Sequence, residues 1–313
     1  MSLLSGLGQM GFMPHLLVLE DPARPCPEYL AKLARAAIPH GIVPISGHID
    51  PTLVPRLVSR LRRAQPHVVH THLLHADLFG IPAARLAGVP AVVSTKHNDD
   101  PFRRGFIGRA DAALARLADR VIVISEHLRR FYRDVEGIPA PKLTRIHYGL
   151  DPDGAPPDGE AVRREFGIGD EPLVGVVARL EAQKGHRFLL EAFVAVRAQI
   201  TAARLLVAGS GPQEAALRAR ARELGLAEAV IFAGFRDDVD RVMAALDLFV
   251  LPSLWEGFGL VLLEAMRAGR AIVASAVSAI PEIVTDGQTG LLVPPRDPES
   301  LAAAIVGLLR DQA

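Results

Sequence analysis

The chain contains a single cysteine, few aromatic residues and no net charge at pH 7. The lone Cys26 excludes a disulfide framework and any metal site built from several cysteines, and it is typical of a reducing compartment. Aromatic residues make up only 5% of the 313 residues, whereas Ala, Leu, Val and Ile dominate. Such a composition favours helices packed on parallel sheets over an all-β sandwich.

Long apolar runs are also missing. No stretch approaches the roughly 18 residues that a membrane-spanning helix needs. The apolar N-terminus, MSLLSGLGQMGFMP, has no basic residue before it, unlike a signal peptide. The sequence therefore predicts a cytoplasmic location.

Charge is distributed unevenly along the chain. Residues 1–150 contain 19 Lys and Arg against 12 Asp and Glu, whereas the remainder contains 16 against 23. Basic residues gather in the predicted helix 51–65 and in the loop 101–109, which contribute Arg56, Arg60, Arg62, Arg63, Arg103, Arg104 and Arg109. Solvated helix faces explain most such runs, although contact with an anionic membrane or a charged acceptor also fits. No nucleic-acid partner is predicted.

Twelve apolar, β-branched runs alternate with helical periods along the chain. They are HLLVLE, IVPIS, HVVHTH, AVVSTK, RVIVIS, KLTRIHYG, LVGVVA, RLLVAG, AVIFAG, LFVLPS, AIVAS and GLLVPP. Continuous apolar strands separated by helices indicate βαβ units whose sheets are covered on both faces. The segment DPDGAPPDGE at 151–160 is rich in Pro, Gly and Asp and is interpreted as a linker. Two domains, 1–152 and 153–313, are expected.

The segment SLWEGFGLVLLEAMRAGR at 253–270 is the most informative part of the chain. A strand runs into a loop with Gly257 and Gly259, and a helix follows that ends near Gly269. The first amides of that helix can hold a diphosphate. Glu264 can then accept both hydroxyls of a ribose, and Glu256 can reach the sugar beyond the diphosphate. The alternative is an ordinary Gly-Phe-Gly turn with solvated carboxylates.

This segment resembles the E-x7-E signature of the retaining "group 1" (family 4) glycosyltransferases of GT-B fold, with EGFGLVLLEA as the match. The resemblance implies an α/β architecture of two doubly wound, Rossmann-like domains that face each other across a cleft. It also implies a nucleoside diphosphate sugar as the donor. Gly257, Phe258, Gly259 and Leu260 would then line the donor together with Glu264.

Both ends of the chain look short against that family. Members open with a strand and a glycine-rich loop before the first helix, and they finish with a helix that crosses back to the first domain. Neither feature is present in this sequence. If the lacking strand is central to the first sheet, its neighbours would expose unpaired backbone, and the activity of this polypeptide would be reduced.

Further residues acquire roles from the same resemblance. In ARLEAQKG, Arg179 and Lys184 have the spacing of the family's diphosphate-binding pair, although most such cations are simply solvated. The turn GSGP brings Gly209 and Ser210 near the nucleotide, unless it is only a strand-to-helix turn. The donor-binding residues implied in this part of the chain are Gly209, Ser210, Phe235 and Arg236, the last two beside the base.

Histidines follow the predicted strands of the first half. In STKHND, His97 lies where the family has a histidine close to the reacting sugar, or it is a strand-end histidine satisfied by its loop. A zinc site could be considered at three closely spaced histidines, His70, His72 and His75. His70 and His72 share a strand face while His75 begins a helix, and no carboxylate or thiol completes a known ligand spacing. No metal is predicted.

The sequence thus predicts a metal-independent enzyme without a cofactor that transfers a hexose, with retention, from a nucleoside diphosphate sugar to a hydroxyl acceptor such as a glycan, lipid or small molecule. Its predicted catalytic residues are His97, Glu256, Arg179 and Lys184. An inverting transferase, a sugar-nucleotide epimerase of the same fold and a non-catalytic sugar-nucleotide-binding protein are the alternatives. A binder would retain the donor and release no product.

Overall fold

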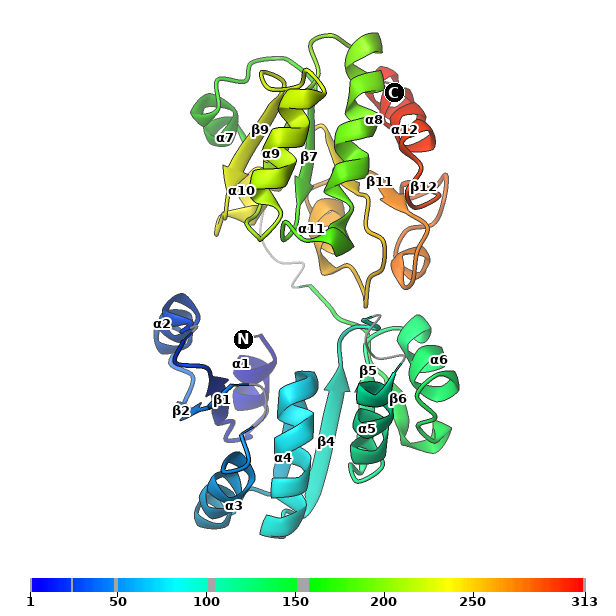
Figure 1. Ribbon diagram of the computed structural model, residues 1–313. Helices are drawn as coiled ribbons and strands as arrows, with labels where there is room; N and C mark the ends of the chain where they lie inside the picture. The colour runs from blue at the N-terminus through cyan, green and yellow to red at the C-terminus, as the bar shows by residue number, and fades with distance from the viewer. Residues whose placement is uncertain (1, 24, 48–49, 101–104, 151–157, 312–313) are drawn as a thin grey trace. The chain divides into compact units, whose positions relative to one another are not determined.

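The computed structural model describes residues 2–23, 25–47, 50–100, 105–150 and 158–311 (Figure 1). Its backbone contacts divide the chain into two compact units, residues 1–95 with 109–121, and residues 96–108 with 122–313. The predicted boundary at 152/153 and most of the predicted linker lie outside the described residues, as do Arg103 and Arg104. None of the described helices is long and apolar enough to cross a membrane.

The second half of the chain forms one six-stranded sheet in the order β12-β11-β10-β7-β8-β9. Every adjacent pair runs parallel. Its strands are β7 (Leu173–Val177), β8 (Arg204–Ala208), β9 (Val230–Gly234), β10 (Leu248–Leu251), β11 (Ala271–Ser275) and β12 (Leu291–Val293). The chain runs outward from β7 to β9 and then returns to β10, so the winding direction reverses between β7 and β10. Such a switch point is where doubly wound sheets bind ligands.

Both faces of this sheet are buried, which explains why its strands read as continuous apolar runs. On β8, Leu205 and Val207 belong to one core cluster, and Leu206 and Ala208 belong to the other. The covering helices are α7 (Glu160–Glu165), α8 (His186–Gln199), α9 (Glu214–Glu223), α10 (Val239–Ala245), α11 (Leu260–Arg267) and α12 (Pro298–Arg310), with short 3₁₀ turns η3 (Ala182–Lys184) and η4 (Ile280–Glu282). The fold class predicted from sequence is confirmed here.

The described residues of the first half form six strands in two sheets, β1-β2 and β3-β4-β5-β6. These strands are β1 (Leu16–Glu20), β2 (His40–Pro44), β3 (Val68–His72), β4 (Ala91–Lys96), β5 (Arg120–Val123) and β6 (Leu143–Arg145). All twelve predicted strands are therefore present. Among the described residues, no strand pairs with the outer edge of β1 or of β3. The helices of this half are α1 (Ser2–Gln9), α2 (Pro27–Arg35), α3 (Leu53–Ala64), α4 (Leu73–Ala87), α5 (Phe106–Ala115) and α6 (Glu126–Asp134), with the 3₁₀ turn η2 (Ala140–Lys142).

The arginines of α3 have internal partners. Arg56 donates to the carbonyl of Pro44 at 2.8 Å and to the Asp50 carboxylate at 2.5 Å. Arg60 donates to the carbonyl of β2 residue 42 at 3.2 Å, and Arg62 to that of residue 86 in α4 at 3.0 Å. These side chains tie α3 to neighbouring backbone. Contact of this helix with an anionic membrane stays a prediction.

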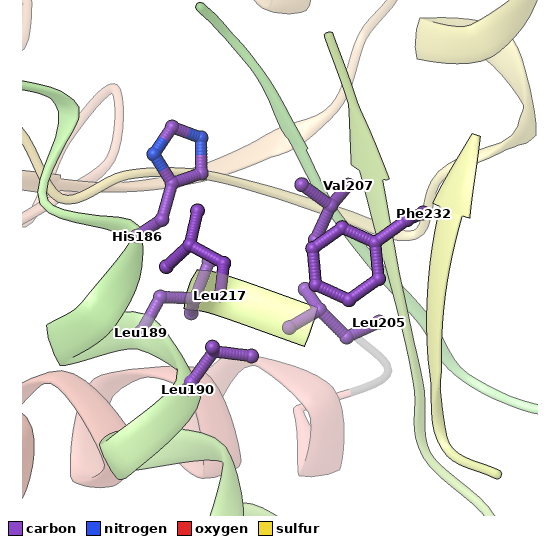
Figure 2. Close-up of a pocket in the computed structure, with 7 residues that line it drawn as sticks. All are labelled: His186, Leu189, Leu190, Leu205, Val207, Leu217 and Phe232. Carbon is purple, nitrogen blue, oxygen red and sulfur yellow. The ribbon is translucent and has the colours of Figure 1, made fainter. Parts of the chain in front are cut away.

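His186, the first residue of α8, is a buried histidine with no polar partner. It is only 3% exposed, and neither ring nitrogen has a hydrogen-bond partner in the part of the chain that the structure describes. Figure 2 shows it beside an apolar cavity that has no room for a water molecule, lined by His186, Leu189, Leu190, Leu205, Val207, Leu217 and Phe232. Burial, with a smaller contribution from the Lys184 charge, lowers the pKa of His186 to about 4.

His186 should therefore make stability depend on pH. The unfolded chain binds a proton near the ordinary imidazole pKa of about 6.5, whereas the native chain does so only near 4. The free energy of unfolding should therefore be unaffected by this group above pH 6.5. It should fall by up to about 3 kcal/mol as pH falls toward 4. Urea unfolding of His186→Leu at several pH values should show a flatter dependence in this window.

The exposed His67 supplies the control, because His67→Gln replaces an imidazole that lies outside the core. Parallel curves for wild type and His186→Leu would show that the buried imidazole is not the titrating group.

Candidate functional site

The two loops at the switch point are held together by backbone. Gly185 has φ +66°, and a Cβ at this position would lie 1.9 Å from the carbonyl oxygen of Pro252, so only glycine fits. The amide of Leu254 donates to the carbonyl of Gln183 at 2.7 Å, and the Gln183 side chain donates to the carbonyl of Trp255 at 2.9 Å. The loop after β7 and the loop after β10 therefore form one rigid platform.

A buried ion pair lies on this platform. Nζ of Lys184 is 2.5 Å from Oε1 of Glu256, and their side chains are only 15% and 7% exposed. The same carboxylate oxygen accepts the hydroxyl of Ser253 at 2.8 Å. The structure thus brings together two residues predicted from separate sequence motifs, and both come from loops that flank the switch point.

Arg179 lies in the same loop as Lys184 but is much more accessible. Its side chain is 67% exposed and pairs with Glu181 at 2.7 Å. An exposed pair of this kind contributes little to stability, because solvent and ions screen it. Arg179 can therefore exchange Glu181 for an anionic ligand at small cost.

Helix α11 begins directly after the glycine loop, as the sequence predicts. Gly259 has φ +96°, a conformation that side chains rarely adopt, and it allows the chain to turn into the helix at Leu260. Phe258 packs inside, only 5% exposed. Burial raises the pKa of Glu264 on α11, and the nearby Asp240 carboxylate adds to this effect while Arg267 opposes it.

The loop after β8 packs against the loop after β7. Gly209 has φ +142°, and a Cβ there would lie 1.9 Å from the carbonyl oxygen of Ala178. The carbonyl of Ser210 accepts the amide of Leu180 at 2.9 Å. Close packing against Ala178 is thus sufficient to explain why position 209 is a glycine. Contact of Gly209 and Ser210 with a nucleotide stays a prediction.

The two residues predicted to flank a base differ in their surroundings. Phe235 is 61% exposed. Arg236 pairs with Asp238 at 2.7 Å and with Glu165 at 2.5 Å, and these hydrogen bonds raise the pKa of its guanidinium. Arg236 therefore anchors α7 to the segment after β9, and its guanidinium is engaged before any ligand binds.

Three histidines of the first half, His70, His72 and His97, lie within a strand or directly after one. His97 follows β4, and its Nδ1 hydrogen-bonds the hydroxyl of Tyr148. The rings of His70 and His72 have centroids 4.2 Å apart, and burial lowers the pKa of His70 to about 4, with a smaller effect of the neighbouring His72. In the described part of the chain, no three His, Cys, Asp or Glu side chains gather as a metal site.

Together these features define a class of protein. A doubly wound parallel sheet carries, at its switch point, two cations, a buried carboxylate and the start of a helix. Cationic side chains and helix amides there suit a phosphorylated nucleotide ligand, as in other nucleotide-binding α/β enzymes.

Comparison with known proteins identifies the family. A family described as Glycosyltransferase Family 4 matches residues 1–153, and one described as Glycosyl transferases group 1 matches residues 171–311. The chain is 30% identical over 280 residues to the GDP-mannose-dependent alpha-(1-6)-phosphatidylinositol monomannoside mannosyltransferase of Mycolicibacterium smegmatis, covering 82% of this chain and 72% of that relative. It is 27% identical to the 2-deoxystreptamine glucosyltransferase of Streptomyces kanamyceticus, covering 98% and 87%.

Solved structures agree with this assignment. The crystal structure of Anabaena HepE in complex with UDP superposes with a TM-score of 0.81 at 25% identity, covering 95% of this chain and 82% of that one. The chain belongs to the group 1 glycosyltransferases of family 4, and its fold is that of the GT-B enzymes.

The buried pair Lys184 and Glu256 should be strongly coupled. Glu256→Gln leaves an uncompensated ammonium group in a largely buried place and should lower the free energy of unfolding by about 3–5 kcal/mol. Adding Lys184→Met should recover much of that loss, which a double-mutant cycle by urea unfolding measures. Arg179→Met, which removes an exposed pair, should cost below about 1 kcal/mol. Additive losses from the two single changes would show that the pair is not coupled.

Glu264→Gln should separate stability from binding. Folding raises the pKa of the Glu264 carboxyl group, so the folded protein loses stability as pH rises through that pKa. At neutral pH, the neutral amide of Glu264→Gln should therefore raise the melting temperature. If Glu264 binds a ribose, the same change should weaken nucleoside diphosphate binding roughly ten- to hundredfold, since a charge-assisted hydrogen bond contributes about 1.5–3 kcal/mol. Calorimetric titration with UDP and GDP measures this. Unchanged affinity would make Glu264 a structural residue.

Proposed function

We propose that this enzyme transfers a hexose from a nucleoside diphosphate sugar to a hydroxyl acceptor, with retention of anomeric configuration and without a metal. The Lys184–Glu256 pair at the switch point is the observation that carries the proposal. Together with Arg179 it supplies two cations where the diphosphate of the donor would lie, and a carboxylate where the sugar would follow.

Donor binding would rearrange this pair. Lys184 and Arg179 would turn from Glu256 and Glu181 to the phosphate oxygens, where they neutralise the charge that develops on the leaving group. Glu256, released from Lys184, would accept hydrogen bonds from hydroxyls of the transferred sugar. The first amides of α11 add to the positive potential. These groups supply what a metal ion provides in other transferases.

The remaining predicted residues complete the donor site. Glu264 would accept the ribose hydroxyls, and Phe235 and Arg236 would flank the base. The loop with Gly209 and Ser210 would border the nucleotide. His97, held by the Tyr148 hydroxyl, would lie beside the reacting sugar.

Retention fits substitution on one face of the sugar. Glu256 is bound by Lys184 and Ser253, which suits a charge-stabilising group better than a covalent nucleophile. The leaving phosphate would then take the proton from the attacking acceptor hydroxyl while the bond to the anomeric carbon forms on the same face.

The relatives suggest the class of acceptor. One is named for phosphatidylinositol monomannoside and another for 2-deoxystreptamine. Each of these names denotes a compound that contains a six-membered carbon ring with several hydroxyl groups. We therefore propose a polyhydroxylated ring as the acceptor, either free or linked to a lipid.

A two-stage assay tests the function. UDP-, GDP- and ADP-sugars are first compared by thermal shift, because a ligand at about 100 times its Kd stabilises by about 2.7 kcal/mol. The stabilising donor is then incubated with myo-inositol and with 2-deoxystreptamine, with and without EDTA. We expect glycoside formation that EDTA does not change, and an anomeric configuration in the product, read by NMR, equal to that of the donor.

Binding of a donor with neither transfer nor hydrolysis would identify a non-catalytic binder. An inverted product would exclude retention, and loss of transfer on chelation, restored by zinc or manganese, would exclude the metal-free mechanism.

A further inference from the structure

Two imidazoles follow neighbouring strands of the sheet β3-β4-β5-β6. His97 comes directly after β4, and His127 is the second residue of α6, which starts after β5. Each ring has one nitrogen tied to another side chain: His97 to the Tyr148 hydroxyl, and His127 to the Asp99 carboxylate. The carboxyl ends of strands are where sheets of this kind receive ligands.

The carboxylate of Asp99 holds the imidazole ring of His127 in a fixed orientation. Nε2 of His127 is 2.7 Å from Oδ2 of Asp99. The Asp99 side chain is 7% exposed, whereas that of His127 is 33% exposed. Oδ1 of Asp99 is buried and lacks a hydrogen-bond partner in the described ranges. Burial of a carboxylate oxygen without a hydrogen bond lowers the stability of the fold. The hydrogen bond between His127 and Asp99 therefore points to a role of the carboxylate in positioning the imidazole.

The position of His127 is also determined by the start of its helix. Ser125 is the N-cap of α6, and its hydroxyl accepts the amide of Leu128 at 3.1 Å. This cap holds the first turn, and therefore the backbone of His127, in place.

The carboxylate decides which tautomer the neutral ring adopts. Because Nε2 faces Asp99, the proton of the neutral imidazole resides on Nε2, and Nδ1 keeps its lone pair. The described residues offer no hydrogen-bond partner to Nδ1 of His127, and the side chain reaches solvent. Nδ1 is thus an oriented acceptor for a hydroxyl proton.

We propose that His127, oriented by Asp99, binds a hydroxyl group of the glycosyl acceptor through Nδ1. His127 would hold a ring hydroxyl by a hydrogen bond, and Asp99 would be a positioning residue that acts through the imidazole. The inference rests on the proposed function, since it assigns the acceptor side of the same reaction. A ring with adjacent hydroxyls is the class of ligand that it fits.

Kinetics with myo-inositol as the probe acceptor test the proposal. His127→Leu and Asp99→Asn should each lower kcat/KM for myo-inositol about tenfold, mainly through KM, because each removes an oriented hydrogen bond. Donor hydrolysis in the absence of acceptor and the affinity for the nucleoside diphosphate should stay within twofold of the wild type. His127→Gln, whose amide oxygen can accept a hydrogen bond, should lose less than His127→Leu. His67→Gln, at an exposed histidine, is the matched control.

A second measurement does not depend on turnover. Nitrogen-15 NMR of the histidine rings should show His127 as the Nε2–H tautomer in the wild type and a mixture in Asp99→Asn. Myo-inositol, added with the nucleoside diphosphate, should shift Nδ1 of His127.

Unchanged kcat/KM in His127→Leu, with wild-type transfer intact, would overturn this assignment alone. Equal losses of donor hydrolysis and nucleotide affinity would show that the pair is only structural. Absence of any transfer by the wild type would overturn the proposed function and the acceptor site together.

Discussion

The buried contact between Lys184 and Glu256 is the constraint on which the switch-point loops of the second half depend. Two charges of opposite sign are largely removed from water at 2.5 Å, and neither tolerates burial alone. Their pairing requires two loops that are far apart in sequence to meet with little freedom. The two loops meet where Gly185 packs closely against the backbone of Pro252. Hydrogen bonds join Gln183 to the backbone of Leu254 and Trp255. The paired charges thus lie in the loops at the carboxyl end of an otherwise apolar sheet.

The two halves of the chain meet different physical demands. The six-stranded sheet of the second half has one core cluster on each face, and His186 is the only histidine in the sequence of that half. The first half divides its strands between two sheets and holds ten of the eleven histidines. The first half thus places imidazoles such as those of His97 and His127 after its strands, whereas the second half buries its single histidine in the core.

Several residues acquired their meaning only from neighbours distant in sequence. The arginines of α3 read as a solvated basic run, but Arg56, Arg60 and Arg62 donate to backbone carbonyls of other elements. Gly209 read as a place of close approach to a ligand, and the structure fills that space with the backbone of Ala178. His127 gave no signal in the sequence, because its partner Asp99 is 28 residues away. Residue type and spacing along the chain do not encode such pairings.

The sequence by itself determined the twelve strands, the helix after the Gly257–Gly259 loop and the doubly wound class, because these depend on local periodicity, glycine conformation and continuous apolar runs. It also marked Arg179, Lys184, Glu256 and Glu264 as candidate residues. Only the tertiary structure decided that Lys184 pairs with Glu256, that Arg179 is exposed while Arg236 is already engaged, and that Asp99 orients His127. These outcomes depend on burial and on distances between loops, which follow from strand order in the sheet and not from any single segment.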